Sequence, residues 1–255
     1  MDLSYLDIET YRLFSEKLMN RYEQNKRNLP WRNTFDPYKV WVSQVILQQT
    51  RVKQGIDYYQ RFISTFPTVY KLAQSSEEDV LRLWQGLGYY SRARNIHKGA
   101  KKVVSMHNGI LPNTYKELLA INSIGEYTAA AILSIAHNKA HATVDGNVYR
   151  VLSRFFAIDI PIDSSAGRRL FQDLAQKLLD KSNPGKHNQA IMEFGALICK
   201  PVQPLCDLCP LQIFCVAKKN GAQSDYPVKS RKVKVRKRYF NYFVIEYKGY
   251  ILLRK

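Results

Sequence analysis

"LLAINSIGEYTAAAILSIA", residues 118 to 136, most directly predicts how this chain folds. A short helix ends near Ala120, a tight turn contains Gly125, and a second helix begins at about Glu126, where alanines at 129 to 131 allow close packing. This order predicts a helix-hairpin-helix. Exposed amides at its turn and at the second helix N-terminus can hold a DNA phosphate without reading sequence. The pattern is only moderately specific alone, because helical hairpins in ordinary cores look similar.

A second helix start follows eight residues later, in "TVDGNVYRVLSRFF" at 143 to 156. Asp145 stands directly before an amphipathic pattern, in the position of an N-cap. Taken alone, this carboxylate is a capping residue rather than a catalytic one.

"VWVSQVILQQT", residues 40 to 50, reads as a buried helix because its apolar residues cover nearly the whole circumference. Gln44 and Gln48 lie one turn apart on one face of it. A buried amide needs hydrogen-bond partners, so this face packs on polar groups or lines a polar pocket.

All four cysteines fall within one short segment, with the spacing C-x6-C-x2-C-x5-C. They are Cys199, Cys206, Cys209 and Cys215. Clustered thiols in an intracellular chain favour a metal centre over disulfides, and four cysteines suit either zinc or an iron–sulfur cluster. The five histidines are scattered and read as surface or phosphate-facing residues.

Composition indicates the class of partner. The 255 residues carry a formal net charge of +18, which favours a polyanion such as nucleic acid. Part of this excess lies in "KSRKVKVRKR" at 229 to 238, so a merely basic surface is the alternative. No stretch has the length of a membrane span or the pattern of a signal peptide, and we expect a soluble intracellular protein.

Start and stop signals predict a mostly helical chain up to about residue 218. They are Asp36-Pro37, Ser75 with Glu78, Asn108-Gly109, Thr114 with Glu117, Ser164 or Ser165, and Pro184-Gly185. Beyond the basic linker, "RYFNYFVIEYKGYILLRK" turns aromatic and β-branched, with Lys248-Gly249 as a hairpin turn. A lone hairpin is marginal, so we expect the first strands of a β domain whose remainder is missing.

Several stretches together resemble the adenine DNA glycosylases of the MutY type, over roughly residues 8 to 218. They are "LPWR" at 29, "DPYKVWVS" at 36, "LQQTRV" at 47, "LWQGLGYYSRARN" at 83, "VDGNVYRVLSR" at 144 and "NQAIMEFGALIC" at 188. The resemblance implies an all-α, two-lobed helix-hairpin-helix DNA glycosylase fold with a four-cysteine [4Fe-4S] lobe. It implies a six-helix lobe at 30–137, a cluster lobe at 1–29 and 138–220, a basic linker at 221–238, and the start of a truncated Nudix-like domain at 239–255.

The resemblance also implies an activity, which is to extrude and remove adenine mispaired with 8-oxoguanine or guanine in duplex DNA. Roles carried over from the family fall on three groups of residues. Trp31, Arg32 and Gln189 line the adenine pocket; Gln49, Leu87 and Tyr89 probe the opposite base, with Thr50 beside them; Gln48, Ser123 and Gly125 contact the DNA. The resemblance further implies a monomer in the bacterial cytoplasm, associated with the nucleoid. Asp145, supported by Asn147 and with Tyr127 packed beside the sugar, stabilises the oxocarbenium-like state of glycosidic cleavage.

Two positions depart from the family pattern. Gln44 stands where the family has a glutamate that protonates the leaving adenine, and an amide cannot deliver a proton at neutral pH. Ser123 stands where the family usually has glycine, so a positive φ there would cost on the order of 1 kcal/mol. We expect impaired base release with retained recognition.

Other functions stay open at this point. A non-catalytic lesion-binding relative would use the same face. An endonuclease III-like lyase needs a lysine nucleophile where Tyr127 stands, which disfavours it. A zinc-stapled basic helical protein without lesion chemistry would make all these matches coincidental.

Overall fold

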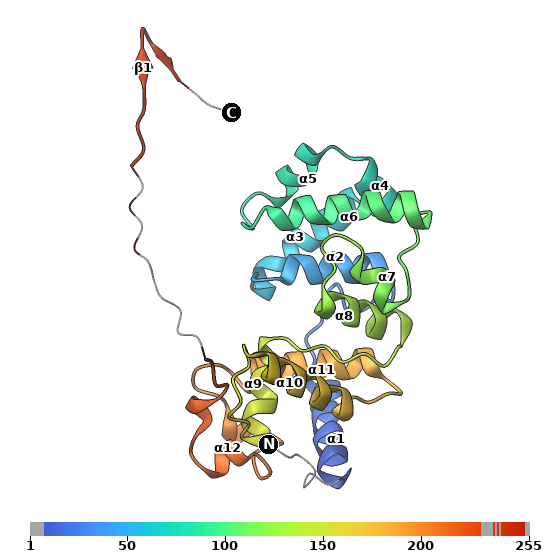
Figure 1. Cartoon of the computed structure of the whole chain (residues 1–255), viewed down its shortest axis with the longest axis vertical. Helices are drawn as coiled ribbons and strands as arrows, with labels where there is room; N and C mark the ends of the chain where they lie inside the picture. The colour runs from blue at the N-terminus through green and yellow to red at the C-terminus, as the bar shows by residue number, and fades with distance from the viewer. Residues whose placement is uncertain (1–7, 231–236, 238, 240, 253–255) are drawn as a thin grey trace.

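The computed structural model of the protein describes residues 8–230, 237, 239 and 241–252. The described residues form two lobes of helices, with a short hairpin of strands lying apart from both (Figure 1). Within the described ranges the strands are β1 (Glu246–Tyr247) and β2 (Tyr250–Ile251), so the expectation of an all-α chain up to about residue 218 is confirmed.

The upper lobe in Figure 1 is built around helix α2, whose apolar residues are buried on all sides. Trp41 and Trp84 are the largest side chains fully enclosed in its core. Its helices are α2 (Pro37–Leu47), α3 (Val52–Thr65), α4 (Val69–Gln74), α5 (Glu77–Trp84), α6 (Ser91–His107), α7 (Tyr115–Leu119) and α8 (Glu126–His137).

The lower lobe joins the N-terminal helix to the second half of the chain. Its core packs Phe14 from the first helix against Phe155 and Phe171. Its helices are α1 (Ile8–Asn25), α9 (Gly146–Phe156), α10 (Ser165–Leu178), α11 (Pro184–Leu197) and α12 (Val216–Lys219), with 3-10 turns η1 (Cys206–Leu208) and η2 (Gln223–Asp225). The chain therefore returns to the lobe in which it begins (Figure 1).

The helix boundaries follow the expected capping residues with one exception. Asp36 accepts a hydrogen bond from the Tyr38 amide at 2.9 Å, and Thr114 caps α7 in the same way. Ser75, however, ends α4, and its neighbour Ser76 caps α5 by accepting from the Asp79 amide. The prediction at Ser75 was wrong by one residue, because two adjacent serines both offer a hydroxyl. The chain therefore breaks between α4 and α5, one residue later than the sequence indicated.

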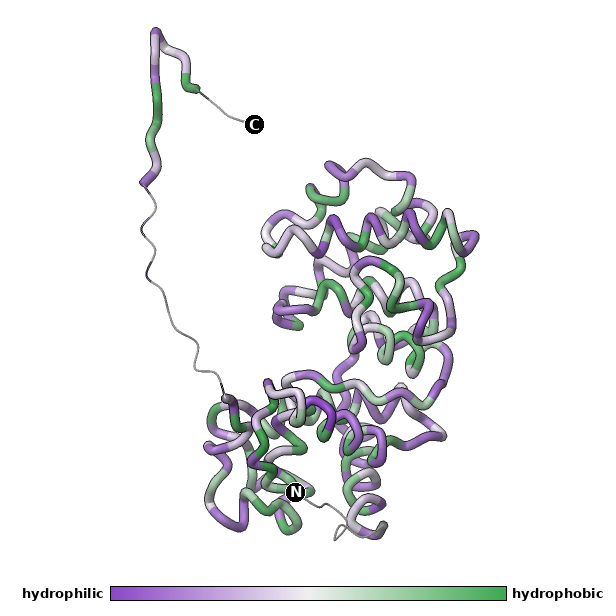
Figure 2. Tube along the Cα trace, in the orientation of Figure 1, coloured by the Kyte–Doolittle hydropathy of each residue, from purple (hydrophilic) through white to green (hydrophobic). Residues whose placement is uncertain are grey.

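Hydrophilic and hydrophobic residues alternate along the helices of both lobes (Figure 2), as expected for helices with one buried and one exposed face. The described residues from 237 onward are exposed, including the aromatic ones. Lys248 and Gly249 form the predicted hairpin turn, both with positive φ. None of the helices in the described ranges combines the length and apolar composition that a membrane crossing requires.

Candidate active site

A cavity of about 540 Å³ lies where the two lobes meet. Its walls come from α2 and the loop after it, from α8, from the start of α9 and from α11. Ten residues predicted from the sequence line it: Trp31, Arg32, Gln44, Gln48, Gln49, Thr50, Tyr127, Asp145, Asn147 and Gln189. Segments far apart in the sequence thus supply one pocket. Gln44 and Gln48 line it, which is one of the two surroundings expected for these amides.

Gln44 is buried in the wall formed by α2, with 7% of its surface exposed. Its Oε1 accepts a hydrogen bond from the Tyr127 hydroxyl at 3.0 Å, and its Nε2 donates to the Ser43 hydroxyl at 3.3 Å. Both ends of the amide therefore have partners, which a buried amide requires.

Tyr127 reaches this amide from α8, and its hydroxyl also lies 3.0 Å from the sulfur of Met192. Burial raises the pKa of Tyr127, and the negative charge of Asp145 raises it further. The phenol is neutral across the physiological range and acts as a hydrogen-bond donor rather than an acid.

Asp145 opens α9 and accepts hydrogen bonds from the amides of Asn147 at 2.8 Å and Val148 at 2.9 Å. Its second oxygen accepts from the Asn147 side chain at 2.8 Å. Arg150 in turn donates to the Asn147 side-chain oxygen at 2.8 Å. Asp145 therefore caps α9 and also lines the cavity, with its two oxygens held by three hydrogen-bond donors.

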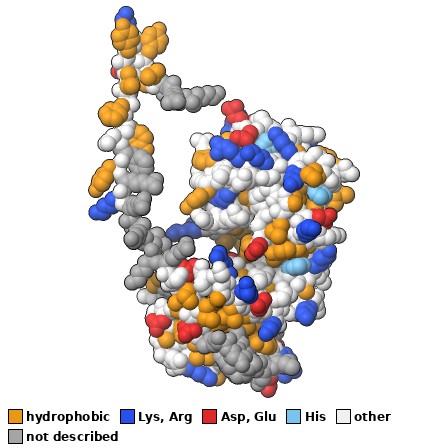
Figure 3. Space-filling model, viewed as in Figure 1, with side chains coloured by type: hydrophobic (Ala, Val, Ile, Leu, Met, Phe, Trp, Pro, Cys, Tyr) orange, Lys and Arg blue, Asp and Glu red, His pale blue; other side chains and the backbone are white. Residues whose placement is uncertain are grey.

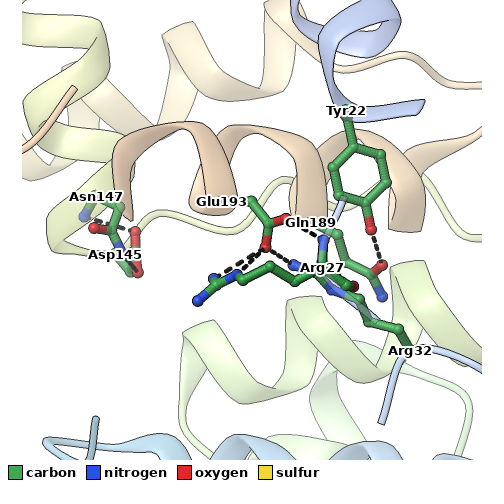
Figure 4. A network of polar contacts seen from close by, with 7 residues as sticks. All are labelled: Tyr22, Arg27, Arg32, Asp145, Asn147, Gln189 and Glu193. Carbon is green, nitrogen blue, oxygen red and sulfur yellow. Dashed lines mark hydrogen bonds and ion pairs between the residues drawn. The ribbon is translucent and has the colours of Figure 1, made fainter. Parts of the chain in front are cut away.

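A second carboxylate lines the cavity from α11: Glu193, which is 5% exposed (Figure 4). One oxygen accepts from the Arg27 amide at 2.8 Å, and the other forms ion pairs with the guanidinium groups of Arg27 and Arg32. Burial alone would raise the pKa of Glu193, but the hydrogen bonds from Arg32 and Arg27 outweigh it and leave the pKa lowered. Glu193 is therefore an ionised group that holds two arginines and cannot donate a proton at neutral pH.

The sequence interpretation did not single out Glu193 or Arg27. The available signal was spacing, since Glu193 follows Gln189 by one helical turn and so faces the same side of α11. Gln189 itself accepts a hydrogen bond from the Tyr22 hydroxyl at 2.8 Å. The wall that carries Arg32 and Gln189 is thus fixed from α1 and α11 together (Figure 4).

The other four residues predicted to contact DNA lie outside the cavity. Leu87 is packed in the upper core, whereas Tyr89 is 63% exposed. Ser123 and Gly125 form the turn of the helix-hairpin-helix, and Gly125 begins α8 without a side-chain cap. The first amides of α8 are therefore available to an anion.

Ser123 has a backbone conformation that L-residues rarely adopt, with φ of +69°, so the strain cost considered for this position applies. Its hydroxyl accepts a hydrogen bond from the indole of Trp41 at 3.0 Å. Because Trp41 is wholly buried, this serine supplies the partner that the indole needs. The hairpin turn is thereby tied to the helix that carries Gln44.

The four cysteines line a separate small cavity of about 30 Å³ in the lower lobe. Burial raises the pKa of Cys209 to about 12, and it also raises the pKa values of Cys199 and Cys215. Among the described residues, no three His, Cys, Asp or Glu side chains are arranged to hold a single metal ion.

His97 and His187, predicted at the surface, are buried instead, because their rings replace apolar side chains on inward faces of α6 and α11.

Comparison with known families gives a match over residues 42–177 to the HhH-GPD superfamily of base excision DNA repair proteins. The chain is 45% identical to an adenine DNA glycosylase of Rattus norvegicus, an alignment covering 86% of the chain and 44% of the rat protein. For an adenine DNA glycosylase of Buchnera aphidicola (strain Bp) the identity is 38%, with 95% of the chain and 69% of the relative covered. The chain thus spans less than half the length of the rat relative.

Solved structures confirm the fold. A thermostable thymine-DNA glycosylase superposes with a TM-score of 0.77 at 24% identity, covering 83% of this chain and 98% of that one. A non-covalent endonuclease III–DNA complex superposes with a TM-score of 0.72 at 21% identity, covering 85% and 98%. The two-lobed glycosylase architecture predicted from the sequence is therefore correct.

Proposed function

Because the chain belongs to the adenine DNA glycosylase family, within the HhH-GPD superfamily of base excision DNA repair proteins, we propose that it binds duplex DNA as a monomer and extrudes an adenine into the cavity between its lobes. The preferred substrate is adenine opposite 8-oxoguanine, with adenine opposite guanine as the weaker one. The observation that carries the proposal is the cavity itself, in which the side chains of Trp31, Arg32 and Gln189 and the Asp145 carboxylate line one space.

The base occupies the part of the cavity lined by Trp31, Arg32 and Gln189. An aromatic ring, a fixed guanidinium and a side-chain amide together suit stacking on a purine and hydrogen bonding to its edge. Glu193 keeps Arg32 in place, and Tyr22 keeps Gln189 in place. The pocket is thus ordered before DNA arrives, which lowers the cost of binding.

Asp145 is the group that stabilises positive charge on the sugar as the glycosidic bond breaks. Asn147 and the two backbone amides hold its oxygens, so the carboxylate keeps its position during the reaction. The base nitrogen, however, meets the amide of Gln44, which donates a hydrogen bond but no acidic proton. Neither Tyr127 nor Glu193 can supply that proton. The pKa of Tyr127 is raised, so its phenol is too weak an acid, and the pKa of Glu193 is lowered, so its carboxyl group is already ionised. We infer strong recognition with base release reduced by about 10²–10⁴-fold.

DNA is held by phosphate contacts on both lobes. The amides at Gly125 and at the start of α8 grip one phosphate. Lys and Arg side chains occur on both lobes of the face in view in Figure 3, among some Asp and Glu. With a formal net charge of +18, binding should weaken steeply as salt rises.

Two other functions differ from this proposal in a single feature each. A lyase would need an amine nucleophile, and among the described residues that line the cavity there is no lysine. A non-catalytic lesion-binding protein would keep the pocket and lack the acid. The presence of Gln44 in the pocket favours this alternative. Activity of Gln44→Glu separates these cases.

The four cysteines would hold a [4Fe-4S] cluster, which would tie the segment from Cys199 to Cys215 to the rest of the lower lobe. Four free thiols around one cavity fit this group. Buried thiols with raised pKa values become thiolates only beside a strong positive charge.

Fluorescence of 2-aminopurine, placed in the duplex where adenine stands opposite 8-oxoguanine, tests base extrusion directly. The proposal predicts a rise in fluorescence on binding, because the analogue leaves the base stack. Gln189→Leu should reduce the rise while leaving affinity for an undamaged duplex unchanged within about twofold. Tight binding without any rise in fluorescence would refute extrusion.

A further inference from the structure

Arg92, at the start of α6, connects two loops that belong to different parts of the upper lobe. These are the first loop, residues 48–51, and the second loop, residues 85–90. Its Nη1 donates to the carbonyls of Val45 and Ile46, both at 3.1 Å, and to that of Gln48. Its Nη2 donates to the carbonyls of Leu87 at 3.5 Å and Gly88 at 3.3 Å. One guanidinium therefore spans both loops.

Each loop contains one residue whose backbone has a conformation that L-residues rarely adopt. Gln49 has φ of +55° and Tyr89 has φ of +48°. Such residues persist only when surrounding contacts hold them. In both loops the carbonyl immediately before the strained residue, that of Gln48 or Gly88, accepts from Arg92.

The charge of Arg92 is compensated by dipoles and rings. Among the described residues, no carboxylate forms an ion pair with it. Its carbonyl partners on α2 lie at the C-terminal end of that helix, where a cation is favoured. The rings of Trp84 and Tyr89 lie 5.4 Å and 5.6 Å from the guanidinium carbon. A cation whose partners are neutral backbone and aromatic groups serves to fix geometry.

We propose that Arg92 is a positioning residue that locks Gln49 and Tyr89 into one unit for reading the base opposite the extruded adenine. The inference rests on the proposed function and on the opposite-base role that the family resemblance implies for these two side chains. A lysine cannot do the same, because an ammonium has no planar fork with which to bond both loops at once.

Hydrogen exchange of Arg92→Lys tests the mechanical part of the inference. In this variant, amides in both the first and the second loop should exchange at least about tenfold faster than in the parent, while those of α8 stay protected. Arg94→Lys is the matched control, because Arg94 is exposed on the same helix and pairs with Glu77 at 3.1 Å. Faster exchange in only one loop, or in neither, would overturn the coupling.

Binding to duplexes with adenine opposite 8-oxoguanine and opposite guanine tests the functional part. In Arg92→Lys the ratio of the two affinities should fall by about tenfold, with binding to undamaged duplex changed by less than about twofold. An equal loss on all duplexes would contradict a reading role. A parent protein that does not distinguish the duplexes would instead refute the proposed function, and the exchange data would still decide whether Arg92 couples the loops.

A double-mutant cycle on Gln49→Ala and Tyr89→Ala gives a test that leaves Arg92 intact. If the two side chains act as one unit, the double variant loses no more discrimination than the worse single variant. Additive losses would mean that the side chains read the opposite base independently, and the inference would fail.

Discussion

The Tyr127 hydroxyl donates a hydrogen bond to the Oε1 of Gln44 at 3.0 Å. This contact orients the amide, so its NH₂ group is the end left near Ser43 and the cavity. A donor at that place can hold a base nitrogen but cannot protonate it. In the proposed function, this arrangement separates recognition of adenine from its release.

Substitutions of Ser123 should separate backbone strain from side-chain bonding. Ser123→Ala keeps the positive φ and leaves the buried Trp41 indole without its acceptor, so it should destabilise the protein by about 1–2 kcal/mol. Ser123→Gly loses the same acceptor but relieves strain worth about 1 kcal/mol, and should be nearly neutral. Urea unfolding measures both, with the exposed Ser105→Ala as control. An alanine variant as stable as the glycine variant would contradict this account.

Glu193→Gln should lower the free energy of unfolding by about 3 kcal/mol, because it leaves two arginines without their counter-charge. Adenine-containing duplexes should also bind more weakly relative to duplexes with an abasic site, since Arg32 loses its support. Chemical denaturation and paired binding titrations measure these effects. Glu78→Gln, at an exposed pair 3.9 Å apart, is the control and should change little.

The ion pairs of Glu193 with Arg27 and Arg32 also predict a pH dependence of stability. The pKa of Glu193 is lowered in the folded protein from its ordinary value of 4.5, so the unfolded chain binds the proton more readily. The stability advantage of the parent over Glu193→Gln should be complete above about pH 4.5 and should vanish as the pH falls through the folded pKa. Unfolding curves recorded from pH 7 downward test this, and an advantage that grows on acidification would contradict it.

The sequence predicted most of the fold because its signals are local. Asp36, Thr114 and Asp145 cap helices as expected, and the hairpin turn lies where Gly125 placed it.

The site was predictable only where residue type and spacing were informative. Glu193 was missed because its importance comes from Arg27 and Arg32, which lie more than 160 positions away in the chain. Burial of His97 and His187 depends on packing between helices, which local pattern does not reveal. Arg92 was overlooked for a similar reason, since its partners are backbone carbonyls of distant loops.

The cysteine site predicts a coloured protein. Purified material should absorb visible light and contain roughly four iron atoms per chain, as a [4Fe-4S] cluster requires. Cys209→Ser should lose the colour and unfold more readily, because a serine hydroxyl is a poor ligand for the cluster. Iron, sulfide and zinc analysis measures the content. A colourless protein with one bound zinc would overturn the cluster assignment.

Single-turnover release of adenine from a duplex with adenine opposite 8-oxoguanine tests the central claim most directly. It should be measured beside binding to the same duplex, for the parent and for Gln44→Glu, with Asp145→Asn added to each as the control for cleavage at this site. We predict tight binding by both proteins and release at least about 10²-fold faster with glutamate, abolished by Asp145→Asn. Equal release rates for the parent and for Gln44→Glu would mean that another group supplies the proton, and would contradict the account.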